Sequence, residues 1–137
     1  MSTDENREFV RGIFERMAAG DGRALTDAMA DDIRWVARGD GAWSGTWTSK
    51  AEVVHGVLLP LLSQFADQYR SKLDRVFADG DHVVVESTGS ATTLRGEPYE
   101  QTYCYVFRIA DRRITEVVEY CDTALTERVL DPPPATV

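Results

Sequence analysis

Two runs of alternating residue types near the C-terminus constrain the fold more than any other part of the chain. The first run places large apolar and aromatic side chains on one parity, namely Tyr103, Tyr105, Phe107 and Ile109. The second run places Ile114, Val118 and Tyr120 on one parity, together with Asp122 at its end. A period of two is typical of a β-strand with two unlike faces. Because the segment between the runs, residues 110–113, is short and mostly polar, the sequence predicts a β-hairpin here.

Composition limits the classes of partner that this chain can have. Its 137 residues fit one domain of about the usual size, 1–137, and 43% of them are hydrophobic. A net charge of −8 without a basic block argues against nucleic acid. The longest apolar run, 57–62, is too short to span a membrane, and the acidic first six residues do not resemble a secretory signal. With two cysteines in predicted strands, we expect a cytoplasmic protein.

The remaining pattern places helices before strands. Apolar spacing predicts a helix over 4–19, capped by Thr3 or Asp4, and a short helix over 23–30. A strand at 33–36 follows, and a capping box at Ser49 starts a third helix that Pro60 should kink or break. Strands over 69–77 and 82–93 lead into the hairpin, and residues 124–130 form a closing helical turn. Order should extend over about 4–130, before the Pro-rich tail 131–137.

This order of elements predicts an α+β fold, with about three N-terminal helices packed on one face of a curved antiparallel sheet. Residues 39–47 form a glycine-rich loop that carries Trp43 and Trp47. Because tryptophan is costly to leave in water, the loop should fold back over an apolar site as a lid or packing element. Together with Trp35, these residues are candidate walls for a flat, apolar ligand. Simple core filling is the alternative, above all for Trp35.

Asp122 is the leading candidate for chemistry, since it ends an otherwise apolar face. Beside Val118 and Tyr120 it would be partly desolvated, which favours a role as general acid or base. The alternative is that it only caps the helix that follows it. Tyr103 and Tyr105 could donate hydrogen bonds to a ligand carbonyl, or could simply be core aromatics.

His55 in the third helix could act as a proton shuttle with Asp122, or could be a boundary residue. Two isolated histidines and two strand cysteines offer no spacing typical of a metal site, so we expect no metal. Cys104 and Cys121 share the parity opposite the expected pocket and could be neighbours. A mixed apolar and charged outer sheet face predicts a homodimer interface, with the residues Glu86, Thr88, Val106, Arg108, Val117 and Glu119.

These landmarks resemble the nuclear transport factor two-like superfamily, in particular its SnoaL-like and ketosteroid-isomerase-related branch. The resemblance rests on the Ala-Asp-Asp-Ile-Arg-Trp segment at 30–35, on Gly45 before the Ser49 helix, and on the closing strand 114–122 with its Tyr-x-Asp end. It covers about residues 5–130. It implies a cone-shaped sheet around a deep apolar pocket, and a homodimer formed through the outer sheet face.

The catalytic positions of members of this superfamily can be matched to residues of this sequence one at a time. Asp122 matches the acidic residue of SnoaL-like cyclases and one aspartate of limonene-epoxide-hydrolase-like members. The Arg and Asp that those hydrolases also need are replaced by Ser87 and Gly89, and Ala37 stands where steroid isomerases carry their base. The sequence therefore predicts a cofactor-independent isomerase, cyclase or hydratase that acts on an apolar carbonyl compound, with Asp122 as acid or base. A non-catalytic ligand-binding or dimeric accessory protein is the alternative.

Overall fold

The computed structural model describes residues 1–134, so the last three residues of the predicted Pro-rich tail lie outside the described part. Its helices are α1 (Thr3–Ala18), α2 (Ala24–Ala28), α3 (Lys50–Val53), the π-helical η1 (Val54–Leu58), α4 (Leu59–Leu62) and α5 (Thr123–Val129). Its strands are β1 (Met29–Ala37), β2 (Gly45–Trp47), β3 (Arg70–Asp79), β4 (His82–Thr92), β5 (Pro98–Ala110) and β6 (Arg113–Cys121). Among the described residues, no helix is long and apolar enough to cross a membrane.

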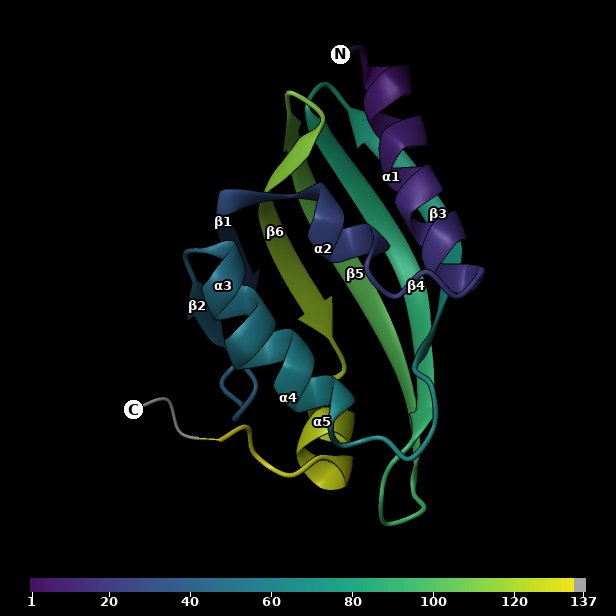
Figure 1. Cartoon of the computed structure of the whole chain (residues 1–137), viewed down its shortest axis with the longest axis vertical. Helices are drawn as coiled ribbons and strands as arrows, with labels where there is room; N and C mark the ends of the chain where they lie inside the picture. Colours follow the sequence, from purple (N-terminus) through teal and green to yellow (C-terminus); the bar gives the residue numbers. More distant parts are fainter. Residues whose placement is uncertain (135–137) are drawn as a thin grey trace.

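The predicted α+β architecture is confirmed. The six strands form one sheet in the order β2-β1-β6-β5-β4-β3, and every neighbouring pair is antiparallel except β1 with β6. Figure 1 shows α1, α2 and the continuous α3–η1–α4 helix on one face of the curved sheet. The sequence pattern indicates only a meander of about four strands. The parallel pair exists because β1 comes early in the chain and lies beside the last strand.

Local signals explain where the helices begin. Ser2, rather than the predicted Thr3 or Asp4, caps α1 through a capping box with Glu5. Ser49 caps α3 as predicted, because its hydroxyl accepts from the Glu52 N–H at 3.1 Å, but the predicted box is not complete, since Glu52 accepts from the Thr48 N–H instead of the Ser49 N–H. Pro60 does not break the helix that Ser49 starts. Instead, the π-helical turn η1 immediately precedes it and changes the hydrogen-bond register where proline cannot donate.

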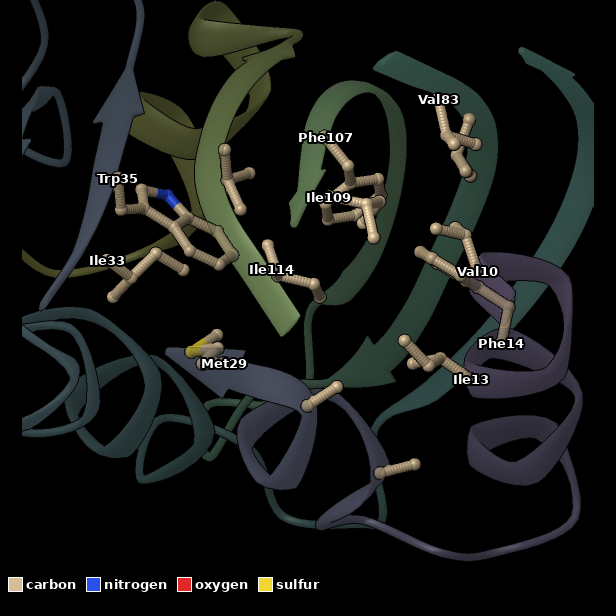
Figure 2. Close-up of a cluster of buried hydrophobic side chains, with 14 of the residues drawn as sticks. Val10, Ile13, Phe14, Met29, Ile33, Trp35, Val83, Phe107, Ile109 and Ile114 are labelled. Atoms are coloured by element: carbon tan, nitrogen blue, oxygen red, sulfur yellow. The ribbon is translucent and has the colours of Figure 1, made fainter. Parts of the chain in front are cut away.

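The core lies between α1 and the inner face of the sheet. Figure 2 shows Val10, Ile13 and Phe14 of α1 facing Val83, Phe107, Ile109 and Ile114, with Trp35, Ile33 and Met29 of β1 completing the cluster. These side chains are almost completely buried, so burial of their apolar surface is the main stabilising contribution. The packing fixes the sheet against α1 and leaves space beneath α3, η1 and α4.

The predicted hairpin is confirmed, but in the later part of its second strand the side chains face the side of the sheet opposite to the one predicted. Asp111 and Arg112 both adopt positive φ, as a two-residue type I′ turn requires. Arg108 pairs with Glu116 and Ile109 pairs with Ile114, which leaves Thr115 as an unpaired bulge residue. A bulge shifts the alternation by one position. The faces predicted for the rest of β6 were therefore wrong.

Candidate functional site

A cavity of about 610 Å³ lies between the inner face of the sheet and the helices α2, α3, η1, α4 and α5. Strands β1, β5 and β6 supply one wall, and apolar side chains of the helices supply the other. This volume is in the range that binds a small organic molecule. The arrangement places a predominantly apolar chamber beside the end of β6.

Four tyrosines line the sheet side of the cavity. Tyr103 and Tyr105 point inward as predicted, and their rings stack at 5.2 Å between centroids. The Tyr99 and Tyr103 hydroxyl oxygens are hydrogen-bonded at 2.7 Å. Tyr69, which precedes β3, completes the group. Burial raises the pKa of all four hydroxyls, so they are neutral hydrogen-bond donors at physiological pH.

Among the carboxylates that line this chamber, Asp27 and Glu127 are exposed, and Glu119 is the half-buried one, although the alternation in the sequence places it on the outer face. The bulge at Thr115 turns Val117, Glu119 and Cys121 inward. Glu119 keeps some accessible surface because it lines the cavity, but protein surrounds it on all other sides. Burial raises the pKa of its carboxyl from 4.5 to about 7, an effect that the nearby Trp35 indole N–H partly opposes. In residues 1–134, no Lys or Arg forms an ion pair with it.

Asp122 lies on the exposed side of the end of β6 and does not line the cavity. Its Oδ1 accepts from the backbone N–H groups of Ala124 and Leu125 at 3.1 and 3.3 Å, so it caps α5. Asp122 has the same parity as Val118 and Tyr120, as predicted, but the face that these residues share is the outer one. Tyr120 is 46% exposed, and neither it nor Val118 reaches the cavity.

His55 is exposed on η1 and does not line the cavity either, so it is not placed beside Asp122 as a shuttle. Among the predicted tryptophans, Trp35 and Trp43 line the cavity and Trp47 does not. Trp47 instead packs against Gly56 of η1, where a β-carbon would overlap its indole nitrogen. No group of three or more His, Cys, Asp or Glu residues in the described part of the chain is placed to hold a metal ion.

The glycine-rich loop over 39–44 folds back onto the C-terminal helix, as predicted for a lid or packing element. Glu127 of α5 accepts from the Ala42 backbone N–H at 2.6 Å, and the Trp43 indole N–H donates to the Asp131 carbonyl at 3.0 Å. A β-carbon at Gly41 would overlap the Glu127 carboxylate, so a larger residue there would displace the Glu127 side chain from its bond to the loop. Through these contacts the loop holds Trp43 against the cavity.

The two cysteines are not neighbours on one face. Cys121 pairs with Tyr103 and lines the cavity, whereas Cys104 pairs with Tyr120 and lies on the outer face. Both are free thiols. Burial and the nearby Glu119 raise the pKa of Cys121 to about 11, so its thiol is protonated at neutral pH.

Comparisons with known proteins agree with this geometry. The family model for the SnoaL-like domain matches residues 10–117. An NTF2-like protein from Burkholderia thailandensis is 26% identical, with a TM-score of 0.78, over 96% of this chain and 100% of that one. A limonene-epoxide-hydrolase-like (LEH-like) epoxide hydrolase from Mycobacterium tuberculosis is 22% identical, with a TM-score of 0.67, over 89% and 86%. TerC, crystallised with polyporic acid, is 21% identical, with a TM-score of 0.74, over 90% and 96%.

No curated protein matches the chain. The family match covers most of the sequence, and the solved structures share its helix-covered curved sheet over nearly their whole length. The chain therefore belongs to the SnoaL-like family of the nuclear transport factor two-like superfamily.

Proposed function

We propose that this protein binds an uncharged, largely apolar carbonyl compound in the cavity and transfers a proton on it, with Glu119 as acid and base. The observation that carries this proposal is the half-buried carboxyl of Glu119, which lies beside the tyrosine hydroxyls and whose pKa burial raises to about 7. A base works best when its pKa lies near the operating pH. The proposed role thus lies with Glu119 and not with the helix cap Asp122.

The position of Glu119 supports this assignment. The resemblance to steroid isomerases places a base at Ala37, which has no acidic group. Ala37 pairs directly with Glu119 across β1 and β6, and both line the cavity. The carboxylate of this chain therefore lies on the neighbouring strand at the same level of the sheet.

The tyrosine cluster supplies the second part of the proposed chemistry. The ionised Glu119 carboxylate removes a proton from the carbon beside the ligand carbonyl. The C–H electron pair forms a new C=C bond, while the carbonyl π electrons move to oxygen. In the Tyr99–Tyr103 pair, one hydroxyl hydrogen joins the two oxygens and the other can donate to that developing oxyanion. Glu119 then returns the proton to the same or a conjugated carbon.

Deuterium exchange tests this function with simple carbonyl compounds, whatever the natural substrate is. Flat aryl ketones and cyclic enones would be incubated with the protein in D₂O, and incorporation beside the carbonyl measured by mass spectrometry. We expect exchange with wild type and with Asp122→Asn, because asparagine also caps helices well. Glu119→Gln should lose it. Retained exchange in Glu119→Gln would contradict the assignment.

The alternative is a binding protein without turnover, which the absence of acidic groups at Ala37, Ser87 and Gly89 favours. The same compounds separate the two functions. A ligand that raises the melting temperature of wild type and Glu119→Gln equally, and exchanges no deuterium with either, would support the binding function instead.

We also propose a homodimer formed through the outer sheet face. The strand register places an apolar row across five strands, made of Phe77, Val84, Val106, Val118 and Val36. Phe77 is 51% exposed, and an apolar row of this length is typical of a protein interface. Of the residues predicted for this face, Glu86, Thr88, Val106 and Arg108 do lie on it, whereas Val117 and Glu119 face inward.

A charge in the middle of this row should separate the subunits. We expect Val106→Asp to weaken dimerisation at least about tenfold, because the carboxylate would be desolvated without a partner. Light scattering across a concentration series measures the effect. Leu94→Asp is the control, since Leu94 is 70% exposed at the tip between β4 and β5, away from the row. Wild type that remains monomeric at high concentration would contradict the dimer.

For the cellular compartment we propose the cytoplasm. The basis is the pair of free thiols on opposite faces of the sheet, which the fold does not bring together for a disulfide.

A further inference from the structure

The Trp35 indole is the most deeply buried polar side chain that lacks a partner in the described part of the molecule. Trp35 is 1% exposed, and its Nε1 has no hydrogen-bond acceptor among residues 1–134. A buried indole N–H normally finds an acceptor, because an unpaired donor loses the hydrogen bond that water would give. This one therefore requires an explanation.

An acidic group, Glu119, lies near the indole. Trp35 pairs with Val117 across β1 and β6, two residues before Glu119, and the side chains of Trp35 and Glu119 share the inner face. The indole N–H already lowers the pKa of the Glu119 carboxyl, although it does not meet full hydrogen-bond geometry. The edge-on contact with Tyr105, at 6.2 Å between ring centroids, holds the indole in place. Figure 2 shows Trp35 among the core side chains that enclose it. Glu119 lines the cavity on the same inner face, so its carboxylate is an acceptor within the surroundings of the indole.

We propose that the Trp35 indole N–H donates to the Glu119 carboxylate when Glu119 is ionised, so that Trp35 is a positioning residue for the proposed base. The other titratable groups that act electrostatically with Glu119 are neutral at pH 7, namely Tyr69, Tyr103, Tyr105 and Cys121. The charged residues that line the same cavity are Arg23, Asp27, Arg38, Lys50 and Glu127, and none of them forms an ion pair with Glu119. Among the neutral donors around Glu119, the indole N–H is a buried one without another partner in the described part of the chain, and so it is free to hold the charged form.

The indole resonances of the wild-type protein test this directly, without a substrate and without a variant that must fold. NMR would follow the Nε1–H signals of the three tryptophans and the Cδ signal of Glu119 as the pH is raised. We expect the Trp35 proton to move downfield with the same midpoint as Glu119, near pH 7, while Trp43 and Trp47 do not follow it. Glu119→Gln should abolish the movement. A Trp35 Nε1–H signal that does not move as Glu119 ionises would overturn the inference.

A substitution provides the second test. Trp35→Phe keeps an aromatic ring but removes the N–H donor. The pH midpoint of Glu119 ionisation should therefore rise by about 1 pH unit. The matched control is Trp43→Phe, which removes the other cavity-lining indole and should leave that midpoint unchanged. An unchanged or lower midpoint in Trp35→Phe would contradict the role. If Trp35→Phe does not fold, the wild-type titration decides.

The inference rests on the proposed function only for the role of Glu119 as a base. Loss of the coupled titration with retained Glu119-dependent exchange would reject the role of Trp35 alone. A coupled titration in a protein whose Glu119→Gln variant still exchanges deuterium would reject the function and leave the Trp35–Glu119 interaction standing.

Discussion

Glu119→Gln is expected to reduce deuterium exchange about 10²–10⁴-fold and, above pH 7, to make the protein more stable than wild type. The loss of exchange follows from the removal of the base. The gain in stability follows from burial, because an ionised carboxylate without a cationic partner is unfavourable in this cavity and glutamine stays neutral. At pH 8 the gain in the free energy of unfolding should be up to about 3 kcal/mol.

The direction of the pH dependence follows from the raised pKa. Because the folded protein holds the Glu119 proton more tightly than the unfolded chain, wild type has its full stability below pH 4.5. Stability then decreases as the pH rises from 4.5 to about 7, and it stays lower above that. Glu119→Gln should not show this decrease. The two proteins should therefore differ most at pH 8 and least near pH 4.5.

Urea denaturation at pH 4.5, 6 and 8 measures these differences, and Asp122→Asn is the matched control. Asp122 is exposed and caps α5, so its replacement should change stability by a similar amount at pH 6 and pH 8. A constant difference between Glu119→Gln and wild type across this range would mean that Glu119 ionises as freely as a surface carboxylate. That result would contradict both the burial argument and the proposed base.

The difference between the predicted and the observed faces of β6 arises at one residue, Thr115. Alternation predicted both strands of the hairpin, and the polar segment at Asp111 and Arg112 predicted its turn. Thr115 carries no local signal for a bulge, since threonine is a good strand residue. Ile114 and Val117 are both buried in the core. Because two residues three apart face opposite sides of a regular strand, their common burial requires a bulge between them. That requirement comes from packing against α1 and β1.

The bulge determines which side chains of β6 line the cavity. A shift of one position exchanges Asp122, Tyr120 and Val118 for Cys121, Glu119 and Val117 on the inner face. The bulge lies on β6, so the alternation along β5 is uninterrupted and placed Tyr103 and Tyr105 correctly. The sequence thus predicted the family and the inward face of β5, while Trp47 and Asp122, predicted for the pocket, do not line it. Which carboxylate faces inward depends on a register that pattern alone does not specify.

Gly89→Ala should destabilise the fold by about 1–3 kcal/mol, although it adds one methyl group. Gly89 is buried on the inner face of β4, and a β-carbon there would overlap the hydroxyl and ring of Tyr69. Tyr69 also stacks on Phe65 at 5.8 Å between ring centroids, so it cannot move away freely. The resemblance to epoxide hydrolases places the missing aspartate or arginine at this strand. The missing side chain at Gly89 leaves room for the Tyr69 hydroxyl, a neutral donor.

A double-mutant cycle separates this overlap from a general effect of glycine replacement. In a Tyr69→Ala background, Gly89→Ala should cost less than about 0.5 kcal/mol, because the two residues then no longer meet. Gly12→Ala serves as the control: a β-carbon at Gly12 meets nothing within 4 Å, and alanine in the middle of α1 should stabilise it by up to about 1 kcal/mol. Urea denaturation gives all four free energies. If Gly89→Ala costs the same with and without Tyr69, the tyrosine does not occupy the space beside Gly89, and the neutral donor wall of the cavity would lose one of its members.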